Sequence, residues 1–250
     1  MIKSKILNQF KNIEHGFFNR KGEISRNIYK SLNCGPGSFD KKINIKKNLN
    51  IVLNKIKYKK KNLILLNQMH SNKFYYLKKN PKKRLKGDGI LTNYRQIALG
   101  ILTADCAPIL FYDPKKKIIG AAHAGWRGAY KRITKKIINF YLKNGSSLKD
   151  IYIVIGPCIS QKNYEVKNDF KKKFVKQNSN NKKYFKSKAN KIFFSLKDYI
   201  VGQLTEFGIK NIEIIKKDTF NVKNNFFSAR RSLKNKNDDY GRNISIIMIK

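Results

Sequence analysis

Apolar residues recur with a helical period in three parts of the chain. In residues 41–60 they stand three or four positions apart, with Lys and Asn filling the positions between them, which predicts an amphipathic helix. The same rhythm returns over residues 130–142, where Gly145 can cap the helix, and over residues 196–207, which stop at Gly208. Three amphipathic helices are therefore expected, each with one face against a core.

Short runs of consecutive apolar residues predict strands that are buried on both faces. These runs occupy residues 63–66, 97–112, 118–123, 151–155, 212–215 and 244–249. We expect 97–112 and 118–123 to be two buried strands joined by a hairpin, because Asp113-Pro114 supplies a turn between them. By contrast, residues 175–191 are polar and rich in Lys and Asn, and are expected to form an exposed loop with ragged helix at its edges.

This succession of strands and helices places the chain in the α/β class. Neither an internal repeat nor a Pro/Gly/Ser-rich linker divides the 250 residues. We therefore expect a single layered domain over residues 1–250, with mixed β-sheets in the interior and helices on their flanks. A chain of this length with 41% hydrophobic residues can bury a large core.

The chain carries 56 Lys and Arg residues against 15 Asp and Glu residues, a formal net charge of +41. Such an excess is typical of proteins that bind polyanions. Here, however, the excess is mostly Lys, is spread along the chain and comes with abundant Asn and Ile, as the codon bias of an AT-rich genome would produce. We interpret the charge as incidental to function and expect no specific nucleic-acid partner.

Three cysteines, Cys34, Cys106 and Cys158, are an odd number, which argues against a secreted disulfide scaffold and favours a reducing compartment. The N-terminal residues contain no apolar stretch of signal-peptide length, and nowhere do about 18 apolar residues run together. We therefore expect a cytoplasmic protein without a membrane partner. At least one of the three thiols is then a candidate for chemistry.

Three residues able to bind a metal lie beside predicted strand ends. His70 follows the 63–66 strand, Cys106 lies within the apolar hairpin and His123 ends its second strand. Imidazole and thiolate are donors that zinc prefers, and three protein ligands leave a fourth position for water or substrate, as in catalytic sites. Alternatively, Cys106 is an inert buried thiol and either His is a hydrogen-bonded core residue. The third histidine, His15, lies in an expected surface segment and is the weaker candidate.

The AGWRG stretch at residues 124–128 lies just before a predicted helix. Small residues let backbone N–H groups approach a ligand, the start of a helix favours negative charge, and Arg127 can fork onto a phosphate or carboxylate. An anion site is therefore expected here. The alternative is a tight strand-to-helix turn with Trp126 packed in the core.

Two acidic residues and three arginines complete the set of candidates. Asp88 lies between two glycines and Asp105 lies beside a candidate metal ligand, so either can act as a base or orient a metal-bound His, or can instead form a turn. Arg230, Arg231 and Arg242 are three of nine arginines in a chain that otherwise uses Lys. An Arg that is kept in such a Lys-rich chain indicates a role in planar bidentate hydrogen bonding, with ordinary salt bridges as the alternative.

Several short motifs occur in a fixed order along the chain. They are Asn67-Gln68-Met69-His70, Asp88-Gly89-Ile90-Leu91-Thr92, Thr103-Ala104-Asp105-Cys106-Ala107-Pro108, His123-Ala124-Gly125-Trp126-Arg127-Gly128, Gly156-Pro157-Cys158-Ile159 and Phe227-Ser228-Ala229-Arg230-Arg231. Together they resemble the YfiH/YlmD family, usually named purine nucleoside phosphorylase, earlier multicopper polyphenol oxidase or laccase, and also peptidoglycan editing factor. The resemblance runs from His15 to Arg242, and its TADC and HAGWRG motifs are the most specific.

This resemblance implies a layered α/β fold shared with some cysteine-hydrolase toxins. It also implies zinc, or copper in some preparations, on His70, Cys106 and His123. The implied activities are phosphorolysis of adenosine, inosine and S-methyl-5′-thioadenosine, together with deamination of adenosine. We take as candidate catalytic residues Cys106, His123 and Asp105, and as candidate substrate- or anion-binding residues Arg127, Asp88, Arg230 and Arg242.

The leading hypothesis is therefore a zinc-dependent purine nucleoside phosphorylase with adenosine deaminase activity. Its partners would be a small nucleoside and phosphate, and we expect a monomer or a weak homo-oligomer. An alternative is a cysteine-type hydrolase that edits peptidoglycan precursors, with Cys106 as nucleophile and His123 as base. A basic RNA-binding protein is a third hypothesis, and it predicts a steep salt dependence without turnover.

Overall fold

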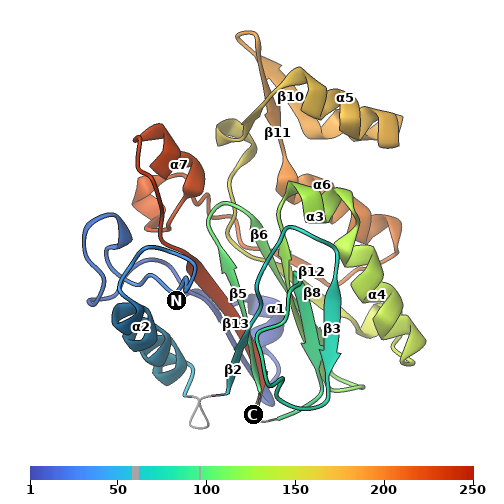
Figure 1. Ribbon diagram of the computed structural model, residues 1–250. Helices are drawn as coiled ribbons and strands as arrows, with labels where there is room; N and C mark the ends of the chain where they lie inside the picture. Colours follow the sequence, from blue (N-terminus) through green and yellow to red (C-terminus); the bar gives the residue numbers. More distant parts are fainter. Residues whose placement is uncertain (58–61, 96) are drawn as a thin grey trace.

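The computed structural model describes residues 1–57, 62–95 and 97–250 (Figure 1). Its helices are, in chain order, α1 (Lys5–Asn8), α2 (Lys42–Lys55), α3 (Trp126–Tyr130), α4 (Ile133–Lys143), α5 (Asn168–Gln177), α6 (Leu196–Glu206) and α7 (Ala229–Lys234). Within the described residues, no helix has both the length and the apolar character needed to cross a bilayer.

The strands form three sheets. The four-stranded sheet has the order β1 (Ile13–Phe17), β13 (Asn243–Ile249), β5 (Ala98–Thr103) and β2 (Leu63–Leu65). The six-stranded sheet has the order β12 (Ile212–Ile214), β8 (Tyr152–Ile155), β6 (Ala107–Asp113), β7 (Ile118–Ala124), β4 (Gly89–Thr92) and β3 (Phe74–Leu77). The three-stranded sheet has the order β10 (Phe185–Lys188), β11 (Lys191–Phe194) and β9 (Glu165–Val166).

Both larger sheets are mixed. In the four-stranded sheet, β2 runs parallel to β5, whereas the β1–β13 and β13–β5 pairs are antiparallel. In the six-stranded sheet the outer pairs, β12–β8 and β3–β4, are parallel and the pairs between them are antiparallel. The predicted α/β class with mixed sheets is therefore confirmed.

The two larger sheets pack face to face, with helices outside them. In β5, Leu99 and Ile101 face the core between the sheets, whereas Ala98 and Leu102 face the core beneath α2. Successive side chains of a strand point to opposite faces, so burial of both faces makes these strands apolar throughout. In Figure 1, α2 flanks the sheets on the left, and α3, α4 and α6 flank them on the right.

The three predicted helices are present with adjusted ends. In place of one helix over 130–142 there are two, because Arg132 between α3 and α4 takes a left-handed φ of 56°. The side chains of α4 that pack on the six-stranded sheet are fully buried and keep the predicted spacing: Ile133, Ile137, Ile138 and Tyr141. The helix predicted over 41–60 ends at Lys55, and its last positions, 58–60, lie outside the described residues.

Two predictions about strands and loops are wrong. Residues 97–112 are not one strand, since they divide into β5 and β6, which belong to different sheets. Residues 175–191 are not an exposed loop. They contain the end of α5, a 3-10 turn and β10, and their Tyr184 and Phe185 are buried in a cluster with Phe174. A few aromatic anchors are enough to fix a segment whose remaining side chains are polar.

The expectation that His15 lies in a surface segment is also wrong. His15 lies in β1 and is only 1% exposed. Its Nε2 accepts a hydrogen bond from the Ser4 N–H at 2.8 Å. Burial lowers the pKa of His15 to about 4, so this imidazole is neutral at physiological pH.

Candidate metal centre

The sheets bring the three predicted metal donors to one place. Cys106 directly precedes the first residue of β6. It lies close to His123, because Pro108 of β6 pairs with His123 of β7. The strands β2 and β5 run parallel, so the segments that follow them leave the same edge of their sheet. Those segments carry His70 and Cys106. Residues far apart in sequence therefore meet at the strand ends.

The three donors form a compact triangle. One donor atom from each of His70, Cys106 and His123 lies within 4.8 Å of the other two. The Cys106 Sγ and His70 Nε2 atoms are 3.8 Å apart, and the two imidazole rings are nearly perpendicular, at 78°. Tetrahedral zinc with ordinary Zn–N and Zn–S bonds places its ligands about 3.5 Å apart. The donor set therefore fits a zinc ion with one position left open.

The charges of these groups are coupled. Burial alone would raise the pKa of the Cys106 thiol, but the charges and hydrogen bonds of His123 and His70 outweigh it and lower the pKa to about 7. Burial would lower the pKa of His123, whereas the charge of Cys106 and the hydrogen bond to Asp88 raise it to about 9. Each group thus shifts the pKa of the other towards the charged form. A divalent ion would take the place of the protons.

Asp88 holds both histidines in position. Its carboxylate accepts hydrogen bonds from His123 Nδ1 at 2.8 Å, from the His70 N–H at 3.0 Å, and from the Ser71 N–H and hydroxyl at 2.7 and 2.6 Å. These bonds stabilise His70 at a positive φ of 57°. Burial favours the neutral acid, but the bonds from His123 and Ser71 lower the pKa of Asp88 to about 2. Asp88 is fully buried and its oxygens are taken up by these donors, which fits the orienting role better than a substrate contact.

Asp105 anchors the turn that presents Cys106. Its φ is 85°, in the left-handed region, and its carboxylate accepts hydrogen bonds from Thr219 Oγ1, Ser228 Oγ and the Arg230 N–H at 2.7, 2.9 and 2.7 Å. Burial raises the pKa of Asp105 against the opposing effect of these bonds. The carboxylate is thus occupied by the protein itself. The geometry supports a positioning role rather than the expected catalytic one.

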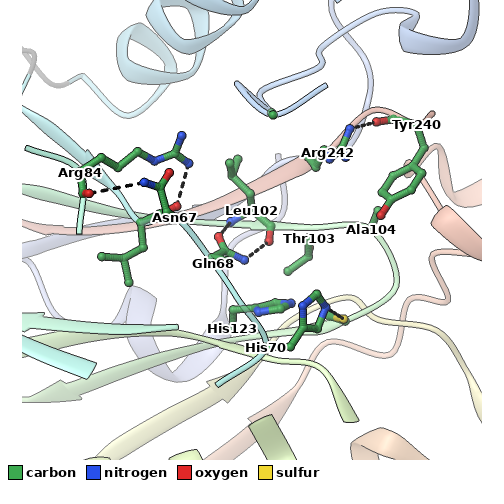
Figure 2. Close-up of a pocket in the computed structure, with 14 residues that line it drawn as sticks. Asn67, Gln68, His70, Arg84, Leu102, Thr103, Ala104, His123, Tyr240 and Arg242 are labelled. Carbon is green, nitrogen blue, oxygen red and sulfur yellow. Dashed lines mark hydrogen bonds between the residues drawn. The ribbon is translucent and has the colours of Figure 1, made fainter. Parts of the chain in front are cut away.

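A cavity of 310 Å³ opens beside the three donors. Its volume lies at the lower end of the range for small-molecule sites. In Figure 2, His70 and His123 lie at the bottom of the view, Arg84 and Asn67 at the upper left, and Arg242 at the upper right. The metal donors and two arginines therefore face one space.

Arg242 is the predicted anion-binding residue that lines this cavity. Its Nη1 donates to Asp239 Oδ1 at 2.8 Å and to the Tyr240 carbonyl, and its guanidinium lies 4.3 Å from the centre of the Tyr240 ring. These contacts fix the side chain before any ligand binds. Arg231, in contrast, donates to backbone carbonyls of Thr219 and Phe226 and serves the fold.

Two other predicted anion-binding residues lie elsewhere. Arg230 lines a separate, open hollow with Trp126 and Tyr164, and its Nη1 donates to the Glu165 carbonyl at 3.0 Å. Arg127 is exposed and lies 5.2 Å from the centre of the Trp126 ring. It lines neither the cavity nor this hollow. An anion contact at Arg127 stays a prediction, and it would lie outside the cavity beside the metal donors.

Sequence reasoning missed two residues of the cavity wall. Gln68 donates to the Leu102 carbonyl at 2.7 Å and accepts from the Leu102 N–H at 2.9 Å, so its side chain holds the His70 segment against β5. Arg84 donates to the Leu66 carbonyl at 2.7 Å. The scarcity of Arg in this Lys-rich chain would have identified Arg84, as it did Arg242.

The other two cysteines are not part of the centre. Cys34 is fully buried under α2, and burial alone raises its pKa. Burial likewise raises the pKa of Cys158 to about 12. Both thiols therefore stay protonated at neutral pH, whereas the pKa of Cys106 is shifted in the opposite direction.

Comparison with known proteins supports the resemblance seen in the motifs. The profile of the family described as multi-copper polyphenol oxidoreductase laccase matches residues 14–250. A purine nucleoside phosphorylase of Rickettsia conorii is 33% identical over 242 residues, which cover 92% of this chain and 100% of that protein. The purine nucleoside phosphorylase YlmD of Bacillus subtilis is 34% identical over 168 residues, 62% of this chain and 60% of that protein.

Comparison with solved structures leads to the same family. The crystal structure of the hypothetical protein YfiH of Bacillus licheniformis superimposes with a TM-score of 0.87 at 28% identity, covering 97% of this chain and 94% of that one. The profile match spans nearly the whole chain and includes all three metal donors. The chain therefore belongs to the YfiH family, whose profile carries the multi-copper polyphenol oxidoreductase laccase description.

Proposed function

We propose that this protein is a zinc-dependent purine nucleoside phosphorylase that also deaminates adenosine. The observation that carries the proposal is the triangle of His70, Cys106 and His123 at the edge of a 310 Å³ cavity. The name purine nucleoside phosphorylase, borne by relatives that cover most of the chain, supports the substrate class. The proposed substrates are adenosine, inosine and S-methyl-5′-thioadenosine.

Zinc is the proposed metal because of the donor set. Two imidazoles and one thiolate suit zinc, and three protein ligands leave a position open for chemistry. The same donors also accept copper, which we propose only as an occasional occupant. A multicopper cluster needs more imidazoles than this chain has, since it contains three histidines and His15 is held by Ser4.

In phosphorolysis, an oxygen of phosphate forms a bond to C1′ of the ribose while the bond from C1′ to the purine nitrogen breaks. The purine leaves with the bonding electron pair and takes up a proton. When bound, zinc supplies a Lewis acid that polarises an oxygen or nitrogen of a reactant. The chain itself orients the site: Asp88 accepts from His123 Nδ1 and so leaves Nε2 facing the centre.

In deamination, the oxygen of a water molecule adds to C6 of adenine, and the amino group leaves as ammonia after proton transfer. His70, Cys106 and His123 would hold the zinc ion beside the cavity, where it would lower the pKa of a water molecule. The HxE and PCxxC motifs of ordinary zinc deaminases are absent from the sequence. Proton transfer here would therefore depend on a different arrangement of residues.

Product analysis tests both activities. Zinc-loaded protein is incubated with adenosine in the presence and absence of phosphate. Adenine and ribose 1-phosphate that form only with phosphate indicate phosphorolysis, and inosine with ammonia that forms without phosphate indicates deamination. If no nucleoside is turned over by protein with about one zinc per chain, the proposed function is wrong.

A cysteine-type hydrolase that edits peptidoglycan precursors is the second candidate. It is favoured by one observation, the closeness of the Cys106 sulfur to the His123 imidazole, whose donor atoms lie within 4.8 Å of each other, which is the pairing that activates a thiol nucleophile. The two candidates respond oppositely to chelation. Hydrolysis of a peptidoglycan precursor that survives removal of the metal and is abolished by alkylation of Cys106 would favour the hydrolase.

A further inference from the structure

The wall of the cavity carries two arginines, and no acidic residue of the described chain lines it. Its described lining residues include Arg84 and Arg242 and contain no Asp or Glu. Arg242 is paired with Asp239, whereas Arg84 is in no ion pair among the described residues, so Arg84 supplies the positive charge that attracts an anion to this concave site. The lining therefore favours a ligand that brings its own negative charge.

Arg84 is the cation of this wall that has no acidic partner. None of the ion pairs found among the described residues includes it. Partial burial lowers the pKa of the Arg84 guanidinium from its usual value. Its side chain nevertheless stays accessible, so a ligand can reach it.

Both arginines are fixed in advance. Arg84 donates one hydrogen bond to the Leu66 carbonyl, and the Nη1 of Arg242 donates to Asp239 and to the Tyr240 carbonyl. The remaining N–H groups of the two guanidiniums have no acceptor among the described residues. A guanidinium with free donors in a fixed plane is suited to bind two oxygens of one phosphate.

We propose that Arg84, with Arg242 on the facing wall, binds the phosphate group used by this enzyme. This inference rests on the proposed function, since it places an anion in the same cavity as the metal donors. The ligand is a phosphate dianion, either inorganic phosphate or the 5′-phosphate of a nucleotide. This phosphate site at Arg84 and Arg242 differs from the anion site expected at Arg127, because Arg127 lies outside the cavity.

The test uses full-length, zinc-loaded protein and three variants. Arg84→Gln removes the charge, Arg84→Lys keeps the charge without the planar fork, and Arg127→Gln is the matched control at an exposed arginine. Binding of inorganic phosphate and of adenosine 5′-monophosphate is measured by calorimetric titration. The KM for phosphate in adenosine cleavage is measured alongside zinc content.

We expect Arg84→Gln to weaken phosphate binding about 10-fold or more, the usual effect of losing charge-assisted hydrogen bonds. Arg84→Lys should lose less, and Arg127→Gln should change binding less than about 2-fold. If the loss falls on inorganic phosphate, the site serves the co-substrate. If only the binding of adenosine 5′-monophosphate is weakened, the site binds the phosphate group of a phosphorylated nucleoside.

Two results separate the inference from the function on which it rests. Cleavage of adenosine with a phosphate KM that is unchanged in Arg84→Gln, together with unchanged binding of both phosphate probes, overturns the anion site and leaves the function standing. Phosphate binding that depends on Arg84 in a protein that cleaves no nucleoside overturns the function and supports the anion site. Equal losses in Arg84→Gln and Arg127→Gln would also reject the site, because they indicate only a general effect of charge.

Discussion

Replacing Asp88 by Asn tests whether one buried carboxylate sets the metal centre. Asn has nearly the same shape as Asp, so the change removes the charge and one acceptor without leaving a cavity. Asp88 uses both oxygens: one accepts from His123 and His70, and the other from the N–H and hydroxyl of Ser71. An amide can satisfy only one of these two sets of donors.

Either orientation of the new amide is costly. If its nitrogen faces Ser71, a buried backbone N–H loses its acceptor, at a cost of about 1–3 kcal/mol. If its nitrogen faces His123, the imidazole must accept at Nδ1 and carry its proton on Nε2, which is the nitrogen left for a metal. We therefore expect Asp88→Asn to bind zinc about 10–100-fold more weakly, the range found for partners of metal-bound histidines.

The assay is a chelator competition for zinc affinity, together with urea unfolding of the metal-free protein. Asp113→Asn is the matched control. Asp113 is also fully buried but lies at the opposite end of β6, where it accepts from the N–H groups of Lys115 and Lys116. The Asp113→Asn variant should keep its zinc affinity, because the amide oxygen can still accept both N–H groups and the residue lies away from the metal donors. Unchanged zinc affinity in Asp88→Asn, or an equal loss in the control, would refute the reasoning.

Three further predictions follow from the same geometry. Cys106→Ala should lose both zinc and nucleoside cleavage, whereas Cys158→Ala should keep both, as metal analysis and adenosine turnover of the folded variants will show. Gly125→Ala should bind zinc about tenfold more weakly or worse in the same competition assay, because an added Cβ would lie 2.8 Å from the Cys106 sulfur and overpacking costs about 1–3 kcal/mol. Burial lowers the pKa of His15 from 6.5 to about 4, so between these pH values the unfolded chain binds a proton that the folded protein does not. The free energy of unfolding is therefore highest above pH 6.5 and falls by up to about 3 kcal/mol as the pH decreases towards 4. In urea unfolding, His15→Gln should show a smaller loss of stability between pH 7 and pH 4.5 than the wild type.

The sequence predicted the elements that are buried on two faces. The strands β6, β7, β8 and β13 were expected because most positions along them are apolar, and the helix α4 because its buried positions repeat every three or four residues. The break between β5 and β6 was not expected. Asp105 is a single polar residue between the apolar Ala104 and Cys106, and hydrogen bonds from residues distant in sequence hold it at a positive φ in the turn.

The metal donors were predictable because imidazole and thiolate side chains are few in this chain. The roles of the neighbouring acids were not. Asp88 and Asp105 are both buried and both saturated with hydrogen bonds, yet one orients the histidines and the other secures a turn. Nothing in their residue type or spacing distinguishes these roles, since each depends on donors from segments far away in sequence.

The sequence by itself determined the class of fold, the likeness to the YfiH family and the identity of the possible metal ligands. These properties follow from hydrophobic period and side-chain chemistry, which are local. The tertiary structure decided which charged residues share a cavity: it placed Arg84 and Arg242 beside the donors and left Arg127 outside. The physical reason is that a cavity is built by strand ends and loops from several parts of the chain, so its electrostatic character is fixed only when the sheets pack.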